Sequence, residues 1–114
     1  MAERHEPRLR LKHAPGPTNA IVARQVRALR EGLGWTQVDL AGALRRRGSH
    51  LDQTAVSRIE ANDRRVTVDD LTMLAGALGA NSPYSLLSDG PPMTEAQARA
   101  QIWQMAERVK RGEL

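Results

Sequence analysis

Residues 36–62 of this chain read TQVDLAGALRRRGSHLDQTAVSRIEAN, and this stretch decides the fold. Each half carries apolar side chains at helical spacing, with a polar, glycine-containing segment between them. Thr36 with Asp39 has the pattern of a capping box, which satisfies free amide hydrogens in a first helical turn. Asp52 can accept such hydrogens for the second half. The stretch therefore predicts a helix that begins at Thr36, a turn, and a second helix at residues 52–61.

Helical signals continue on both sides of this pair. Residues 20–34 place apolar side chains on one helical stripe, and Thr67 with Asp70 repeats the capping-box pattern. Ser82 before Pro83 predicts another helix, with the serine as its cap.

No segment alternates apolar and polar residues with the period of a strand, so we expect an all-α protein. A last helix begins at Thr94, where Gln97 completes a third capping box. We expect a compact domain of five short helices, preceded by a flexible basic arm and followed by a linker and an extra C-terminal helix. The expected bounds are 1–19 for the arm, 20–88 for the domain, 89–93 for the linker and 94–114 for the C-terminal helix.

The core should be aliphatic, because the chain has no Phe, one Tyr and two Trp. Its expected members are the apolar residues on the inner stripe of each helix. They are Val22, Val26, Leu29, Leu33, Leu40, Ala41, Leu44, Val56, Ile59, Val68, Leu71, Leu74, Ala75, Leu78, Leu86 and Leu87.

Composition argues against several classes of site. The chain has no cysteine, which excludes a disulfide framework and a thiolate metal site. The three histidines lack the spacing of metal ligands, and no glycine-rich phosphate loop is present. No apolar run approaches the roughly 20 residues of a membrane helix, and the N-terminus has no apolar signal segment. We expect a cytoplasmic protein of a bacterium or phage-infected host, without enzymatic activity, metal, cofactor or evident small-molecule ligand.

Charge is distributed unevenly around a formal net charge of +4. Residues 21–65 carry nine basic and five acidic side chains, whereas residues 66–93 carry no basic and three acidic ones. This asymmetry indicates a polyanionic partner, nucleic acid before membrane, since no basic amphipathic anchor is present. The alternative is an arginine-rich face that is only solvated.

The helix at residues 52–61 combines an apolar inner face, Val56 and Ile59, with an outer face poor in acids. Gln can form a bidentate hydrogen bond to adenine and Arg to guanine, and a Thr methyl can contact that of thymine. Such side chains suit a helix that reads the major groove, although an ordinary polar exterior is the alternative. The candidate base-reading residues are Gln53, Thr54, Ser57 and Arg58.

Two stretches, VRALREGLGWTQVDLAGAL and QTAVSRIEANDRRVTVDDLTMLAGALG, resemble the helix-turn-helix family of lambda-type phage repressors and Cro proteins. This is also called the xenobiotic-response-element family. The motifs are TQ and LA in the first helix of the pair, VSRIE in the second, and L..LA.ALG downstream. The resemblance spans residues 20–88 and implies a transcription regulator, most often a repressor such as a phage immunity repressor. It implies a double-stranded DNA operator and binding as a homodimer.

The resemblance also implies roles for single residues. The four outer-face residues are its base-reading positions. Gln37 matches a Gln that binds a phosphate and braces the second helix, and Arg30 with Glu60 matches an internal ion pair. Arg64 and Arg65 lie in the loop where the family contacts phosphates.

This chain departs from the family pattern at two places. Its turn, RRRGSH, is longer than usual and puts three candidate phosphate contacts, Arg45, Arg46 and Arg47, beside the second helix. Asn62 stands where the family often has Gly, and Asn accepts the left-handed conformation required there.

Both ends of the chain carry further candidates. A basic arm could enter the minor groove, or could be a solubilising tail. Apolar side chains on the last helix could contact a second copy, or could pack on their own domain. The arm candidates are Arg8, Arg10 and Lys12, and the candidate dimer contacts are Ile102, Trp103, Met105 and Val109.

Two other classes of protein would also fit. An antitoxin-like protein would bind a toxin through its last helix and regulate its own operon. A protein-interaction module would keep the fold without binding DNA, but the clustered arginines and the acid-poor face argue against it.

Overall fold

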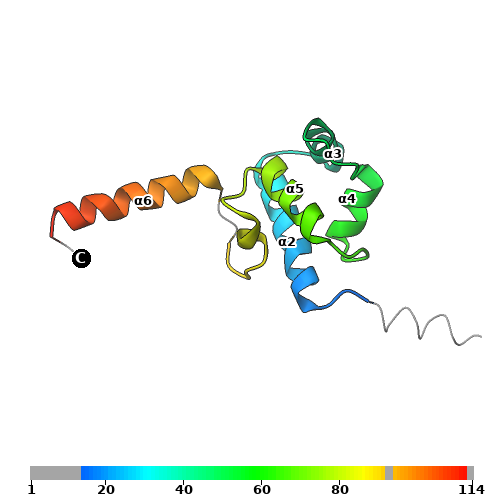
Figure 1. Ribbon diagram of the computed structural model, residues 1–114, viewed down its shortest axis with the longest axis horizontal. Helices are drawn as coiled ribbons and strands as arrows, with labels where there is room; N and C mark the ends of the chain where they lie inside the picture. Colours follow the sequence, from blue (N-terminus) through cyan, green and yellow to red (C-terminus); the bar gives the residue numbers. More distant parts are fainter. Residues whose placement is uncertain (1–13, 92–93, 113–114) are drawn as a thin grey trace, which may run out of the picture.

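The computed structural model describes residues 14–91 and 94–112, and in that part the chain is helical (Figure 1). Apart from one isolated bridge between Ala80 and Thr94, these residues form no β-structure. The all-α prediction is therefore confirmed. The elements are α2 Pro17–Gly32, α3 Gln37–Arg46, α4 Gln53–Glu60, α5 Val68–Leu78, the 3-10 helix η2 Pro83–Leu86, and α6 Glu95–Lys110.

Side-chain caps begin most of these helices where the sequence predicts them. Thr36, Thr67 and Thr94 each complete a capping box, at the starts of α3, α5 and α6. At the start of α4, Asp52 accepts a hydrogen bond from the amide of Ala55 at 2.9 Å. Because caps depend only on residues within one turn, these starts are readable from the sequence.

Two helix starts differ from the prediction. α2 begins at Pro17 rather than at Ala20, because the fixed φ and missing N–H of proline suit a first turn. Ser82 does not cap the fifth element with its side chain. Instead, its carbonyl oxygen accepts hydrogen bonds from the amide and the hydroxyl of Ser85, at 3.1 and 2.8 Å. This i to i+3 bonding makes η2 a 3-10 helix of four residues.

The core lies where the helices of the domain meet. α2 packs against α4, α5 and η2, and α3 packs against α4 and α5. The largest fully buried side chains are all predicted core residues: Leu40, Leu44, Ile59, Leu74, Leu78, Leu86, Val26 and Val56.

Some residues were assigned wrongly or missed, and the missed ones include the buried Ala23 and Ala43. Val68 is 80% exposed and Leu33 is 43% exposed, although both were expected in the core. Val68 is the first residue of α5 and Leu33 is the C-cap of α2. Both lie at helix ends, where the helical periodicity that predicts burial does not continue on both sides. Leu51 is 2% exposed, and it was missed because it lies between helices, where no periodicity marks it.

The long turn closes α3 with a defined geometry. Gly48 adopts a left-handed φ of 87°, and its amide bonds the carbonyl of Arg45 at 3.0 Å. The amide of Ser49 bonds the carbonyl of Leu44 at 3.0 Å, which completes a Schellman motif. Leu51 then enters the core. The extra residues therefore carry the chain to α4 along a fixed path.

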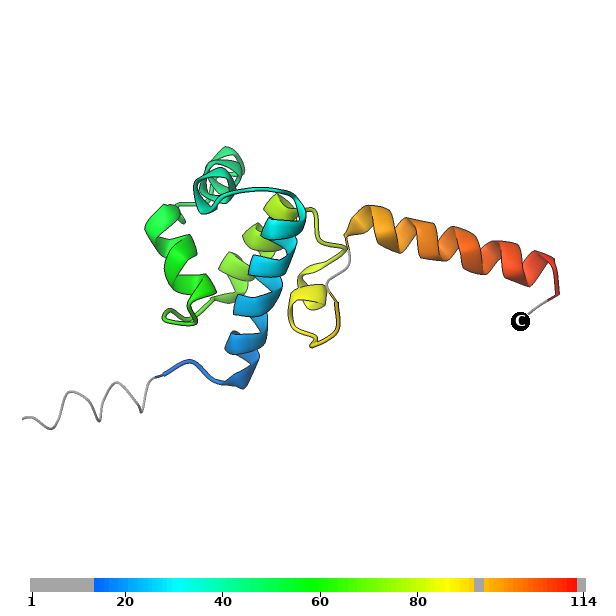
Figure 2. The same ribbon diagram turned by 180° about the vertical axis from the view of Figure 1, so that it is seen from behind.

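α6 leads away from the other helices, at the opposite end of the molecule from α4 (Figure 1 and Figure 2). None of its residues is buried. Ile102, Trp103, Met105 and Val109 expose 67, 69, 59 and 58% of their surfaces. The alternative in which this helix packs on its own domain is therefore wrong. Among the described helices, none joins the length and the apolar character needed to cross a membrane.

Candidate nucleic-acid interface

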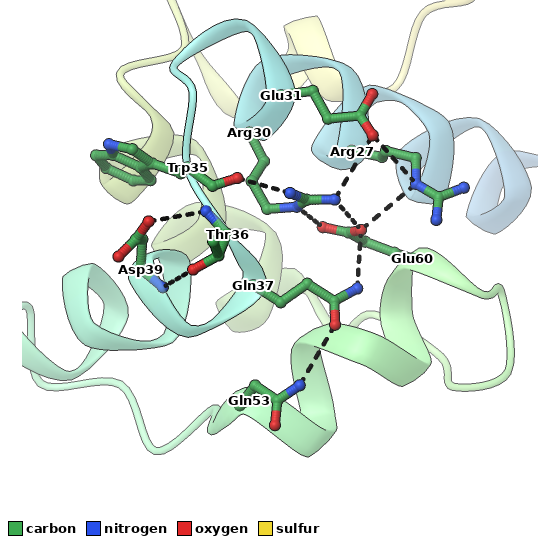
Figure 3. A network of polar contacts seen from close by, with 9 residues as sticks. All are labelled: Arg27, Arg30, Glu31, Trp35, Thr36, Gln37, Asp39, Gln53 and Glu60. Atoms are coloured by element: carbon green, nitrogen blue, oxygen red, sulfur yellow. Dashed lines mark hydrogen bonds and ion pairs between the residues drawn. The ribbon is translucent and has the colours of Figure 1, made fainter.

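A buried ion pair joins α2 to the end of α4 (Figure 3). Arg30 donates from Nε to Glu60 Oε2 at 2.6 Å and from Nη2 to Oε1 at 3.0 Å. Its Nη1 donates to the backbone oxygen of Trp35 at 2.7 Å. The hydrogen bond to Glu60 raises the pKa of Arg30 in spite of burial. This pair therefore holds α2, the α2–α3 connection and α4 together.

Two glutamines extend this network to the first turn of α4 (Figure 3). Gln37 donates from Nε2 to Glu60 Oε1 at 3.1 Å, and its Oε1 accepts a hydrogen bond from Gln53 Nε2 at 3.4 Å. A carboxylate only accepts, so Gln37 must turn its NH2 group to Glu60 and its oxygen to Gln53. The carboxylate of Glu60 thereby sets the orientation of both amides.

Arg27 is a member of the network that the sequence analysis missed. Its Nε lies 3.6 Å from Glu60 Oε1 and 3.9 Å from the carboxylate of Glu31. The spacing of Arg27 and Arg30 places both side chains on one face of α2, and Arg27 with Glu31 is an i, i+4 pair. Those two spacings are the signal that could have found it.

The outer face of α4 carries the four predicted reading residues. Gln53, Thr54 and Arg58 are exposed, and Ser57 is partly exposed. Arg58 makes a loose ion pair with Asp63, at 3.9 Å between Nε and Oδ2, and both side chains are more than half exposed. An exposed pair of this kind contributes little to stability, so Arg58 can exchange it for another partner.

A family model described as helix-turn-helix matches residues 26–84, a span that includes α3, α4 and the whole polar network. The chain belongs to the lambda-repressor and Cro-like helix-turn-helix family. It is a DNA-binding transcription regulator. Comparisons with curated proteins and with solved structures gave no match. In this helix-turn-helix protein, α3 is the first helix of the motif and α4 is the second, which the family uses for recognition.

The loop after α4 is held by α2. Asn19 donates from Nδ2 to Asn62 Oδ1 at 2.9 Å and to the carbonyl of Arg64 at 3.1 Å. Its Oδ1 accepts a hydrogen bond from the amide of Val66 at 2.9 Å. Asn62 has a φ of 57°, the left-handed conformation expected for it. The sequence analysis missed Asn19, because nothing in the sequence links it to a partner 43 residues away.

The two arginines of that loop differ in their surroundings. Arg64 is partly buried and donates from Nη1 to Asp70 Oδ2 at 3.0 Å, so it braces the start of α5. Arg65 is exposed, and its Nη2 lies 3.4 Å from the carbonyl oxygen of Ala14, to which it donates. The loop thus presents one partly buried guanidinium bonded to Asp70 and one more exposed guanidinium bonded to the backbone at Ala14.

The surroundings of Asp70 predict acid sensitivity. Burial raises the pKa of Asp70, but hydrogen bonds from Thr67 and Arg64 lower it by more than burial raises it. The pKa of Asp70 therefore lies below its ordinary value. A carboxyl with a lowered folded-state pKa contributes stability above its unfolded pKa of about 4 and loses this contribution as the pH falls further. We expect the urea midpoint of unfolding to drop below that pH, and to drop less in Asp70→Asn. Equal pH dependence in both proteins would contradict this.

The three arginines that were expected in the turn point to different places, and the first two, Arg45 and Arg46, belong to the last turn of α3 because the helix continues to Arg46. Arg47 lies over α5, where a Cβ on Gly76 would come within 2.7–2.9 Å of its guanidinium. Arg45 lines a hollow of about 230 Å³ that also borders Gln53. Arg46 is exposed near the end of α3. The structure therefore brings Arg45 to the surface that carries Gln53, and it directs Arg47 onto α5.

The predicted arm contacts, Arg8, Arg10 and Lys12, lie outside the described residues. Within the described part of the chain, no cluster of three or more His, Asp or Glu could hold a metal ion.

Proposed function

We propose that this protein is a sequence-specific repressor that inserts α4 into the major groove of a double-stranded operator. We place it, as a homodimer, in the cytoplasm of a bacterial or phage-infected cell. The observation that carries the proposal is the fixed, acid-poor outer face of α4. Val56 and Ile59 are fully buried. The helix cannot rotate without exposing them, so its outer side chains stay turned toward a ligand.

Gln53 keeps the groups that a bidentate hydrogen bond to adenine needs. One of its N–H groups is taken by Gln37, so its carbonyl oxygen and second N–H are left for a base. Adenine presents the matching donor and acceptor in the major groove. Arg58 offers two N–H donors for the two acceptors of guanine, and Thr54 offers a methyl group for thymine. Ser57 supplies a hydroxyl in the second turn.

Phosphate contacts would supply affinity and register without sequence information. Arg45 borders the same hollow as Gln53, and Gln37 and Arg64 are already oriented by internal partners. Groups held in place before binding lose less conformational entropy when they bind. The proposed phosphate contacts are Gln37, Arg45, Arg46, Arg64 and Arg65. Arg47 is left out because its guanidinium lies over Gly76 of α5.

Repression is the simplest regulatory outcome of this architecture. A protein that occupies DNA required by a polymerase represses without any further contact, whereas activation needs an additional surface that touches the polymerase. The proposed function therefore requires only a well-placed operator.

Two arginine substitutions should separate base reading from phosphate binding. Arg58→Ala should weaken binding to the preferred site by about 1–3 kcal/mol and relax one base position. Arg46→Ala should weaken all sequences alike and reduce the slope of log affinity against log salt by roughly one unit. Binding titrations at several salt concentrations, on preferred and random DNA, measure both effects. An unchanged base preference in Arg58→Ala would show that the reading face is assigned wrongly.

Random-site selection with the purified chain tests the proposal as a whole. A palindromic consensus would support sequence-specific binding by a symmetric dimer. Binding that is equally strong for all sequences, at low and at moderate salt, would exclude it.

The exposed apolar side chains of α6 also favour a second candidate function. An antitoxin-like protein would use that face to bind a toxin and would regulate its own operon through α4. Co-expression with candidate small toxins and recovery of a stoichiometric complex would support this alternative over the repressor.

A further inference from the structure

The base of α6 is attached to the domain at two points. Buried Gln25 of α2 donates from Nε2 to the carbonyls of Ser88 and Gly90, in the linker that precedes α6. Arg24 forms an ion pair with Asp89 in the same linker at 2.8 Å. These contacts hold residues 88–90 against α2.

The second attachment lies at the first turn of α6 itself. The amide of Glu95 donates to the carbonyl of Gly79, just after α5, at 3.0 Å. Ala80 and Thr94 form a bridge beside this bond. The direction in which α6 leaves the domain is therefore set by bonds to both α2 and the end of α5.

The exposed apolar side chains of α6 form a narrow seam. Ile102, Met105 and Val109 follow one another at spacings of three and four residues, which is the a, d, a pattern of a coiled coil. β-branched residues at the a positions, here Ile102 and Val109, favour two parallel strands. Trp103 lies about 100° around the helix from Ile102, so it borders the seam. Glu95, one heptad before Ile102, is engaged with Arg99 at 3.7 Å, and the seam therefore begins after it.

The position of α6 agrees with a parallel pair. α4 and α6 lie at opposite ends of the molecule (Figure 1 and Figure 2). In a symmetric dimer on DNA, both α4 helices face the DNA, so both α6 helices leave from the far side and point the same way. Two such helices would meet side by side.

We propose that α6 and its attached base form a rigid dimerisation arm. The arm pairs in parallel with α6 of a second copy through Ile102, Met105 and Val109, and it thereby restricts the spacing between two operator half-sites. Gln25 and Arg24 are positioning residues for this spacing. The proposal rests on the homodimeric repressor proposed above and assigns its interface and its spacing rule.

The size of the seam decides how the pair behaves. α6 has 16 residues, which makes it about 24 Å long. A strip of that length and one helix wide covers well under the roughly 800 Å² per partner of a standard interface. The arm therefore associates weakly in free solution. Two adjacent half-sites would complete dimerisation, because they hold two copies at a high effective concentration.

Single cysteines test the seam without DNA, because the chain has no native cysteine. Ile102→Cys and Val109→Cys should each form disulfide-linked dimers under mild oxidation, since each position faces its own copy in a parallel pair. Gln104→Cys, on the opposite side of α6, is the control and should cross-link at least about tenfold more slowly. Equal rates at all three positions would overturn the seam. The two variants are also mixed. Disulfides that form only between Ile102→Cys of one chain and Val109→Cys of another would overturn the parallel arrangement.

Operators with altered spacing test the attached base. Displacing one half-site by two base pairs turns it by about 70° around the DNA and should weaken binding of the unmodified protein by about tenfold or more. In Gln25→Ala the penalty should fall below about threefold, while affinity for a single half-site stays unchanged. Arg24→Ala, at an exposed position, gives the same test if the Gln25 variant does not fold.

The outcomes separate this inference from the proposed function. A full spacing penalty in both variants would overturn the role of the attached base. Sequence-specific binding of monomers only would overturn the arm and leave base reading intact. Binding without any base preference would overturn the repressor proposal and this inference with it.

Discussion

Glu60→Ala should destabilise the domain by about 3–5 kcal/mol, the usual result of removing one partner from a buried ion pair. Arg30 would remain buried with its Nε and Nη2 deprived of the acceptor that they now share. Arg27 and Gln37 would lose the same carboxylate. For a domain of this size, the loss corresponds to a decrease in Tm of more than about 10 °C. Thermal and urea unfolding, followed by circular dichroism, measures it.

Glu31→Ala is the matched control. Glu31 also lies near Arg30, at 3.8 Å, but its side chain is 62% exposed. An exposed pair contributes about 0–1 kcal/mol, so this variant should remain close to the unmodified protein. Similar stability losses in Glu60→Ala and Glu31→Ala would contradict the structural role of Glu60.

A double variant shows where the loss comes from. If the loss in Glu60→Ala arises from an unpaired buried charge, replacing both partners, as in Arg30→Met with Glu60→Leu, should recover much of the stability. We expect both Glu60→Ala and the double variant to bind DNA poorly, because in both proteins Gln37 would have no carboxylate to orient it. Stability and base reading would then be separated in one protein.

The parts of the fold that could be predicted depend on residues close together in the chain. The capping boxes at Thr36, Thr67 and Thr94 lie within single turns, and the stripes that bury Leu40 and Leu74 repeat over a few residues. Local patterns of this kind are independent of the rest of the structure. The class of fold and the helix order followed from them.

The contacts that could not be predicted join segments far apart in the chain. Asn19 holds the loop at residues 62–66, and Gln25 holds the linker at residues 88–90. A lone Asn or Gln on a helix carries no sign of its partner, because the hydrogen bond depends on how the helices pack. Arg47 has the same explanation: its neighbours in sequence suggest a phosphate contact, whereas packing puts its guanidinium over Gly76.

The resemblance supplied what local patterns lacked for the site. It paired Arg30 with Glu60, residues that the structure brings to 2.6 Å. It also singled out Gln37, but not the hydrogen bonds by which Gln37 links Glu60 to Gln53. Those bonds connect the amide of Gln53 to the buried carboxylate of Glu60, which the resemblance did not imply.

Gln53→Ala should weaken binding to the preferred operator by about 1–3 kcal/mol, or roughly 5- to 150-fold. The loss should vanish on operators in which the adenine opposite Gln53 is replaced, because no bidentate hydrogen bond remains to be lost. Competition titrations with paired operators measure both values. The control is Gln104→Ala, an exposed amide on α6, which should bind both operators like the unmodified protein.

Combining Gln53→Ala with Gln37→Ala tests whether the two glutamines act as a unit. Gln37→Ala removes the proposed phosphate contact and also releases the Gln53 amide, so its effect should contain part of the effect of Gln53→Ala. The double variant should therefore lose less than the sum of the single losses, with a coupling of about 0.5–3 kcal/mol. Additive losses would mean that Gln53 reads its base without help from Gln37. A coupling that persists after the adenine is replaced would mean that the pair stabilises α4 rather than base recognition.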